Sequence, residues 1–134
     1  MDTASKILIL GGVLNLAYGL LTGIPASIIR QKQPTYSKYL RLVHIGALMW
    51  GPLLISLTLA LMLSPLAEGI ETLAASLMVA ASFLLDAKDT LNWRMGIQDE
   101  FAEKPVLPLA FGALSSLASL AGMAIILVGV VQGL

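Results

Sequence analysis

Residues 41–63 read RLVHIGALMWGPLLISLTLALML, and this stretch decides the fold. After Arg41 it holds no Asp, Glu, Lys or Arg, and it includes the only histidine of the chain, His44. A helix needs about 20 mainly apolar residues to cross the hydrocarbon core of a bilayer. Because no water is present there to bond a bare backbone, a run this long predicts a membrane-spanning helix rather than a strand.

The composition of the whole chain agrees with a membrane protein. Of its 134 residues, 57% are hydrophobic and only 12% are charged, against about 25% charged in soluble domains. The mean hydropathy is +0.88. This hydropathy predicts the lipid bilayer as a partner. Eight acidic and eight basic residues cancel, so no net charge indicates binding to nucleic acid. The absence of cysteine excludes disulfides, cysteine-bound zinc, iron–sulfur clusters and covalently attached haem.

Four apolar runs are long enough to span a bilayer. We expect helices over residues 6–29, 36–63, 69–94 and 106–131. The connections between them are short, so consecutive helices should be antiparallel. The predicted fold class is therefore all-α, an integral membrane four-helix up-down bundle that forms a single domain over residues 1–134.

Basic residues concentrate near two of the three connections, and the positive-inside rule turns this into an orientation. The first connection has Arg30, Lys32, Lys38 and Arg41, and the third region has Lys88, Arg94 and Lys104. The second connection has no basic residue and carries Glu68 and Glu71. We expect the first and third connections in the cytoplasm and both termini outside. The expected location is a bacterial inner membrane.

Small residues predict where helices pack closely. The last run carries them at three- and four-residue steps, and the first has one such pair; they are Gly112, Ser115, Ser119, Gly122 and Gly129, and Gly19 and Gly23. Such stripes let helix backbones approach, either within one bundle or between protomers. A homo-oligomer is a further expectation, because four helices expose much surface to lipid.

Polar residues inside the predicted spans indicate a site, because each of them is costly in a bilayer. Arg41, His44 and Gly51 share one face of the second helix by spacing. The C-terminal end of the antiparallel third helix should lie beside them. There Ser82, Asp86, Asp89 and Trp93 share one face, and the amide residue Asn92 lies alongside. Asn15 and Tyr18 lie nearer the middle of the first helix, where they are candidates for substrate contact or for a hydrogen bond between helices.

His44 and Asp86 each leave alternatives open. His44 is either a metal or haem ligand or a structural histidine bonded to Asp86 or to a carbonyl group. Asp86 either orients the imidazole of His44, or faces a substrate cavity, or pairs with Arg41 or Lys88.

The segment from Arg41 to Gly51 resembles the second helix of the styrene oxide isomerases, which are small four-helix membrane enzymes. The shared features are a histidine near the start of the helix, a glycine two residues later and another glycine seven residues later: His44, Gly46 and Gly51. The resemblance implies a homotrimer that binds haem b, with His44 as axial ligand of ferric iron and Arg41 and Gly51 as further cofactor-binding residues. It implies isomerisation of an epoxide to an aldehyde or ketone. Two features depart from the family: Trp50 replaces an asparagine, and the third-helix pattern is not in register.

The functional expectation is thus a haem b-binding membrane protein that isomerises a hydrophobic small molecule. An open iron position would act as a Lewis acid, and apolar surroundings would exclude water. By location, Tyr18, Asn15 or Asp86 would orient the substrate as catalytic residues. Two other classes compete: a non-catalytic assembly subunit in which His44 is structural, and a small transporter or proton-relay subunit.

Overall fold

The computed structural model describes all 134 residues, and it contains helices and no strands. The helices are α1 (Thr3–Lys32), α2 (Lys38–Leu61), α3 (Glu68–Arg94), the four-residue α4 (Glu100–Glu103) and α5 (Val106–Gly133). The four long helices have the length and hydropathy to cross a membrane. The predicted all-α four-helix membrane bundle is confirmed, and the chain is an integral membrane protein. Each predicted span lies within three residues of a long helix at both ends.

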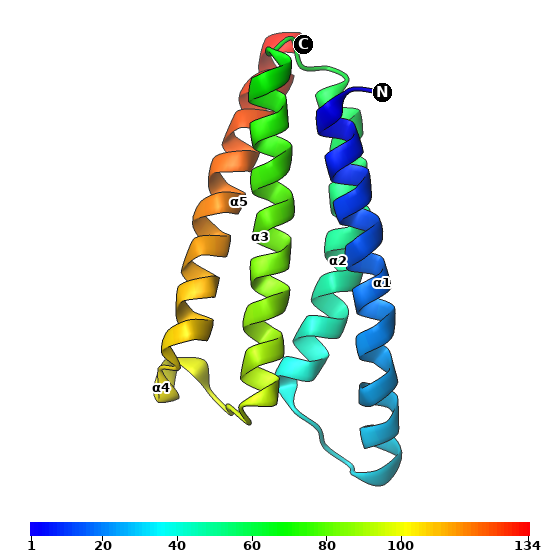
Figure 1. The fold of residues 1–134 in the computed structure, drawn as a ribbon, viewed down its shortest axis with the longest axis vertical. Coiled ribbons are helices and arrows are strands. Elements are labelled where there is room, and N and C mark those ends of the chain that lie inside the picture. Colours follow the sequence, from blue (N-terminus) through cyan, green and yellow to red (C-terminus); the bar gives the residue numbers. More distant parts are fainter.

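The four long helices run alternately up and down, so the two termini lie at the same end of the molecule (Figure 1). Two antiparallel pairs make most of the contacts, α1 with α2 and α3 with α5. α3 joins the pairs because it also contacts both α1 and α2, whereas α5 contacts α2 only weakly. α3 is therefore the central helix of the bundle.

Helix ends follow the local sequence. Asp2 caps α1, and its carboxylate accepts a hydrogen bond of 2.6 Å from the backbone N–H of Ser5. Such caps satisfy N–H groups that have no partner inside the helix. Arg30 and Lys32 lie in the last turn of α1, where positive charge is favourable against the helix dipole.

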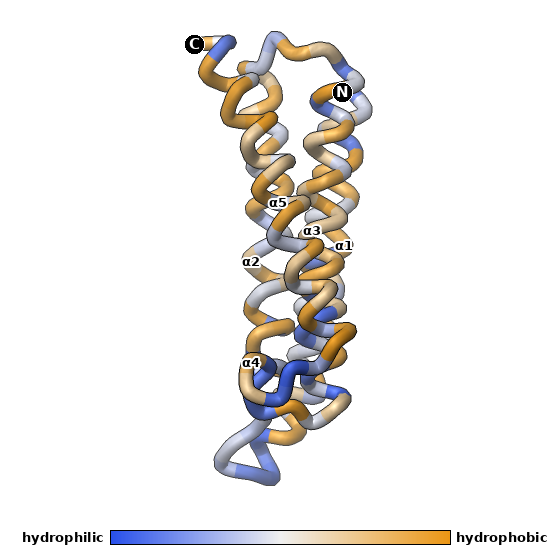
Figure 2. The backbone as a smooth tube through the Cα atoms, turned by 90° about the vertical axis from the view of Figure 1, so that its left-hand side faces the viewer, coloured by the Kyte–Doolittle hydropathy of each residue, from blue (hydrophilic) through white to orange (hydrophobic).

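The interior is apolar near the termini and polar near α4. The main apolar cluster comes from all four long helices: Ala4, Leu8, Leu54, Leu57, Leu61, Ala74, Ala75, Met78 and Ile126. Towards the other end α3 buries Ser82, Asp86, Asp89 and Asn92 instead. Figure 2 shows hydrophilic residues gathered around α4 and the connection between α1 and α2. The polar end is the part of the bundle in which a functional site has to be sought.

Small residues set the helix spacing inside the chain. A Cβ atom at Gly12 would lie 2.7 Å from the carbonyl oxygen of Gly51, so these two glycines allow α1 and α2 to touch. On α5, Ser115 donates a hydrogen bond of 2.7 Å to the carbonyl oxygen of Ala81, and a Cβ at Gly122 would lie 3.0 Å from the carbonyl oxygen of Ala74. The small-residue stripe of α5 thus packs on α3.

Candidate functional site

His44 is held against α1 by a hydrogen bond to backbone. Its Nδ1 lies 2.7 Å from the carbonyl oxygen of Gly19. A carbonyl oxygen only accepts hydrogen bonds, so Nδ1 carries the proton. In the neutral imidazole the other nitrogen, Nε2, then has a free lone pair, which is the form that binds a metal ion. Of the bonding partners considered for a structural histidine, a carbonyl group is the one that His44 has.

The packing of the ring depends on Gly23. A Cβ atom there would lie 2.8 Å from Cε1 of His44, so only glycine leaves space for the imidazole in this position. The ring lines a cavity of about 450 Å³ together with residues of α1 and the connection after it: Gly23, Ala26, Ser27, Arg30, Gln31 and Tyr36. The Arg30 guanidinium lies 5.9 Å from the centre of the Tyr36 ring. We name this space the His44 cavity.

The His44 cavity offers one imidazole nitrogen as a possible metal ligand, within a lining of mostly polar or small residues. No group of three or more His, Asp or Glu side chains is placed to hold a bare metal ion. A haem supplies four ring nitrogens itself and needs only one axial imidazole from the protein. Metal-bound histidines usually donate their second N–H to a carbonyl or carboxylate, as Nδ1 of His44 does to Gly19. Arg30 adds a positive charge that matches the carboxylates of haem b.

Arg41, Met49 and Gly51 lie away from the His44 cavity. Arg41 is exposed. Gly51 is buried against Gly12 in the α1–α2 interface. Met49, whose thioether could also bind iron, is 69% exposed on another face of α2. Within one chain, His44 is therefore the single side chain in this cavity with a metal-binding nitrogen.

A second cavity, of about 610 Å³, lies along α3 on the other side of α1. It is lined by Leu14, Tyr18, Phe83, Asp86, Ala87, Thr90, Leu91 and Phe111, and we name it the Asp86 cavity. Tyr18 Oη and Thr90 Oγ1 are 2.6 Å apart, and Thr90 Oγ1 also donates to the carbonyl oxygen of Asp86 at 2.6 Å. The Asp86 carboxylate has no hydrogen bond or ion pair. Of the roles considered for Asp86, facing a cavity is the one that matches its position.

Asn15 is buried beside this cavity but does not line it. Its Nδ2 donates to the carbonyl oxygen of Gly11 at 2.8 Å and to Ser82 Oγ at 2.9 Å, while its Oδ1 has no partner. Asn15 thus ties α1 to α3, and Tyr18 does the same through Thr90. Both residues therefore form hydrogen bonds between helices, and only Tyr18 also lines the Asp86 cavity.

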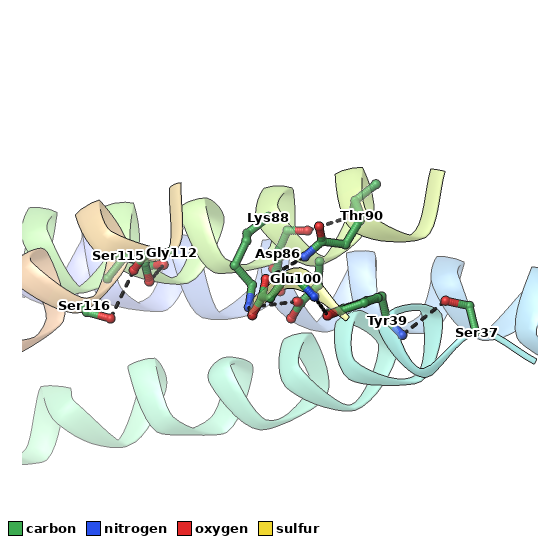
Figure 3. A network of polar contacts seen from close by, with 12 residues as sticks. Ser37, Tyr39, Asp86, Lys88, Thr90, Glu100, Gly112, Ser115 and Ser116 are labelled. Atoms are coloured by element: carbon green, nitrogen blue, oxygen red, sulfur yellow. Dashed lines mark hydrogen bonds and ion pairs between the residues drawn. The ribbon is translucent and has the colours of Figure 1, made fainter. Parts of the chain in front are cut away.

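A buried polar cluster closes the end of the bundle near α4 (Figure 3). Lys88 Nζ lies 3.0 Å from Glu100 Oε1 and 3.1 Å from Asp89 Oδ1; the second contact is an ion pair without hydrogen-bond geometry. Asn92 Nδ2 donates to Glu100 Oε2 at 2.7 Å, and the Glu100 N–H donates to Tyr39 Oη at 2.9 Å. Glu100 therefore connects α2, α3 and α4.

The structure does not bring all the predicted site residues together. His44 and Asp86 form no hydrogen bond or ion pair, and their two cavities share no lining residue. His44, Leu48 and Gly51 all face α1, as shown by their closeness to its glycines. The sequence reasoning did not identify Glu100, Phe83 or Phe111. For Glu100 the preceding Asp99 was a usable signal, because aspartate is a preferred helix N-cap.

Comparison with known proteins adds no relative. No family model, no curated protein and no solved structure gives a significant match to this chain. The fold and the sites therefore define the class of protein, an all-α integral membrane protein with a histidine cavity and a carboxyl cavity.

Proposed function

We propose that this protein binds haem b, with Nε2 of His44 as the axial ligand of the iron. The observation that carries the proposal is the 2.7 Å contact between His44 Nδ1 and the Gly19 carbonyl oxygen. This hydrogen bond fixes the tautomer with the proton on Nδ1, so the free lone pair is on Nε2, which is not bonded to α1. Gly23 keeps the space for the ring, and Arg30 in the same cavity is available to a propionate.

We extend the proposal to the reaction of the family that the Arg41–Gly51 segment resembles, isomerisation of a hydrophobic epoxide to an aldehyde or ketone. Ferric haem with an open position supplies a Lewis acid for the epoxide oxygen. Within one chain no second side chain competes for that position, since Met49 lies on another face of α2. An apolar epoxide would enter from the bilayer, against which Leu20, Leu21 and Ile24 of α1 are exposed.

Tyr18, Asn15 and Asp86 do not act on this substrate within the same chain, because the cavity of Tyr18 and Asp86 is separate from that of His44. Their proposed role in orienting the epoxide requires a second copy of the chain, as in the homotrimer that the resemblance implies. The proposed location is a bacterial inner membrane, with the connections that follow α1 and α3 in the cytoplasm.

A second candidate is a non-catalytic assembly subunit in which His44 is structural. The same hydrogen bond favours it, because the Gly19 carbonyl and the Gly23 gap give the imidazole a well-packed position without any ligand. The two candidates differ in one observable, since only the first has a haem absorption spectrum.

The test is an absorption spectrum of protein purified in detergent from cells supplied with a haem precursor. We expect a Soret band with about one haem per chain and, on addition of styrene oxide, formation of an aldehyde. Protein that is folded and helical but takes up no haem, either in cells or from added hemin, would contradict the proposal and favour the structural role of His44.

A further inference from the structure

The Asp86 cavity has a chemistry of its own that haem binding does not use. We propose that it binds a lipophilic cation, such as an amine or onium ion with apolar substituents, with the Asp86 carboxylate as counter-ion. The inference rests on the unpartnered carboxylate, the charges around it and the side chains that line the cavity.

The Asp86 carboxylate has no partner from the protein. Asp86 is 6% exposed, lines the cavity, and accepts no hydrogen bond on its side chain. The nearest hydroxyl protons are already used. Thr90 Oγ1 donates to the backbone oxygen of Asp86, so the Tyr18 hydroxyl has to donate to Thr90. Neither proton remains for the carboxylate, and an ionised buried carboxylate without a partner is costly unless a proton or a cation neutralises it.

The surrounding charges leave a deficit of positive charge. Lys88 is the only basic residue that forms ion pairs here, and its ammonium is shared between Asp89 and Glu100. Three buried carboxyl groups thus accompany one ammonium group. When all three are ionised, two negative charges remain uncompensated, and Asp86 is the one of the three that has no ion pair with Lys88 and lines the Asp86 cavity. An anionic ligand would be repelled from this position.

The rest of the cavity is apolar and aromatic. Phe83, Phe111 and Tyr18 come from three different helices, and their rings can attract a cation through their faces. The volume of about 610 Å³ lies within the usual range of ligand pockets, about 300–1,000 Å³. At the rim Leu14 is 47% and Phe83 is 41% exposed, so the cavity opens on the outer surface of the helices. A ligand that enters from lipid has to be apolar apart from its charge.

The experiment measures binding of tetraphenylphosphonium to the purified protein in detergent by equilibrium dialysis, with empty micelles as the blank. Tetraphenylborate has nearly the same shape and the opposite charge. We expect saturable binding of the phosphonium, about one per chain, and none of the borate. Asp86→Asn should weaken phosphonium binding at least tenfold. Glu71→Gln, which changes a buried carboxyl at the opposite end of α3, should retain it.

Equal binding of phosphonium and borate, or no saturable binding, would overturn the proposal without use of any variant. Unchanged binding by a folded Asp86→Asn protein, or loss of binding in Glu71→Gln, would also overturn it. Within one chain the proposal is independent of haem, because His44 does not line this cavity. His44→Ala should therefore keep phosphonium binding even when haem is lost.

Discussion

Glu100 is the residue that holds the polar end of the bundle together. Its carboxylate accepts from Lys88 and Asn92, and its backbone N–H donates to Tyr39. We expect Glu100→Gln to lower the free energy of unfolding by about 1.5–3 kcal/mol, because it removes the charge from two buried hydrogen bonds. Thermal unfolding in detergent measures this. The matched change Glu68→Gln, at an exposed residue bonded to Thr3, should stay within about 0.5 kcal/mol. Equal losses in both variants would contradict the role of Glu100.

Glu103 accepts hydrogen bonds from the backbone at the start of α4. The backbone N–H groups of Asp99 and Gln98 donate to its carboxylate and hold the pKa of Glu103 below its ordinary value. A lowered pKa means that the stabilisation is present above the pKa of the unfolded chain and is lost as the pH falls through the lower, folded pKa. We expect the Asp99 and Gln98 amides to lose hydrogen-exchange protection only in that acidic window. In Glu103→Gln their protection should be weaker and independent of this titration; a Glu103→Gln profile identical to wild type would exclude the mechanism.

At the scale of the helices, the α1–α2 contact depends on glycine. A Cβ at Gly12 would meet the Gly51 carbonyl oxygen at 2.7 Å, and a backbone atom cannot move aside as a side chain can. We expect Gly12→Ala to destabilise the protein by about 1–3 kcal/mol. Gly46→Ala is the control, since no atom lies within 4 Å of the new Cβ, and it should be neutral or slightly stabilising. Unfolding midpoints in detergent compare the two, and a Gly12→Ala protein as stable as Gly46→Ala would refute close packing here.

The helices themselves could be predicted from the sequence, but their rotation could not. Apolar runs and terminal charges place the ends of a span, because the bilayer fixes its length. The antiparallel arrangement predicts His44 and Asp86 at the same end of the bundle, yet two residues there meet only if both helices turn these residues towards each other. The glycines at positions 19 and 23 turn His44 towards α1 instead. This information lies in pairwise packing, which periodicity within one helix does not contain.

The Asp86 cavity was predictable only in part. The cost of an ionisable residue inside a span indicated that Asp86 and Tyr18 face a cavity or a partner. The sequence does not indicate that Phe83 and Phe111 line a cavity, because an aromatic side chain in a span is equally favourable against lipid. Glu100 lies outside the spans, and only the docking of α4 brings it to Lys88.

For the whole molecule, the charge distribution predicts the orientation in the membrane. From the lysine and arginine counts we propose that the connections after α1 and α3 lie in the cytoplasm. The chain has no cysteine, so single cysteines report without interference. We expect Lys32→Cys to resist a membrane-impermeant thiol reagent in intact cells and to react after lysis, whereas Glu68→Cys, at the other end of the bundle, should react in intact cells. The reverse pattern would invert the topology.

The central claim is that Nε2 of His44 binds haem iron, and loss and rescue of the ligand test it most directly. His44→Ala removes the only imidazole of the chain and leaves its space beside Gly23 open. We expect the purified variant to lose the Soret band while its helicity is unchanged. Hemin together with free imidazole should restore the band, and hemin alone should not. A His44→Ala protein that keeps the wild-type haem content and spectrum without imidazole would contradict the claim.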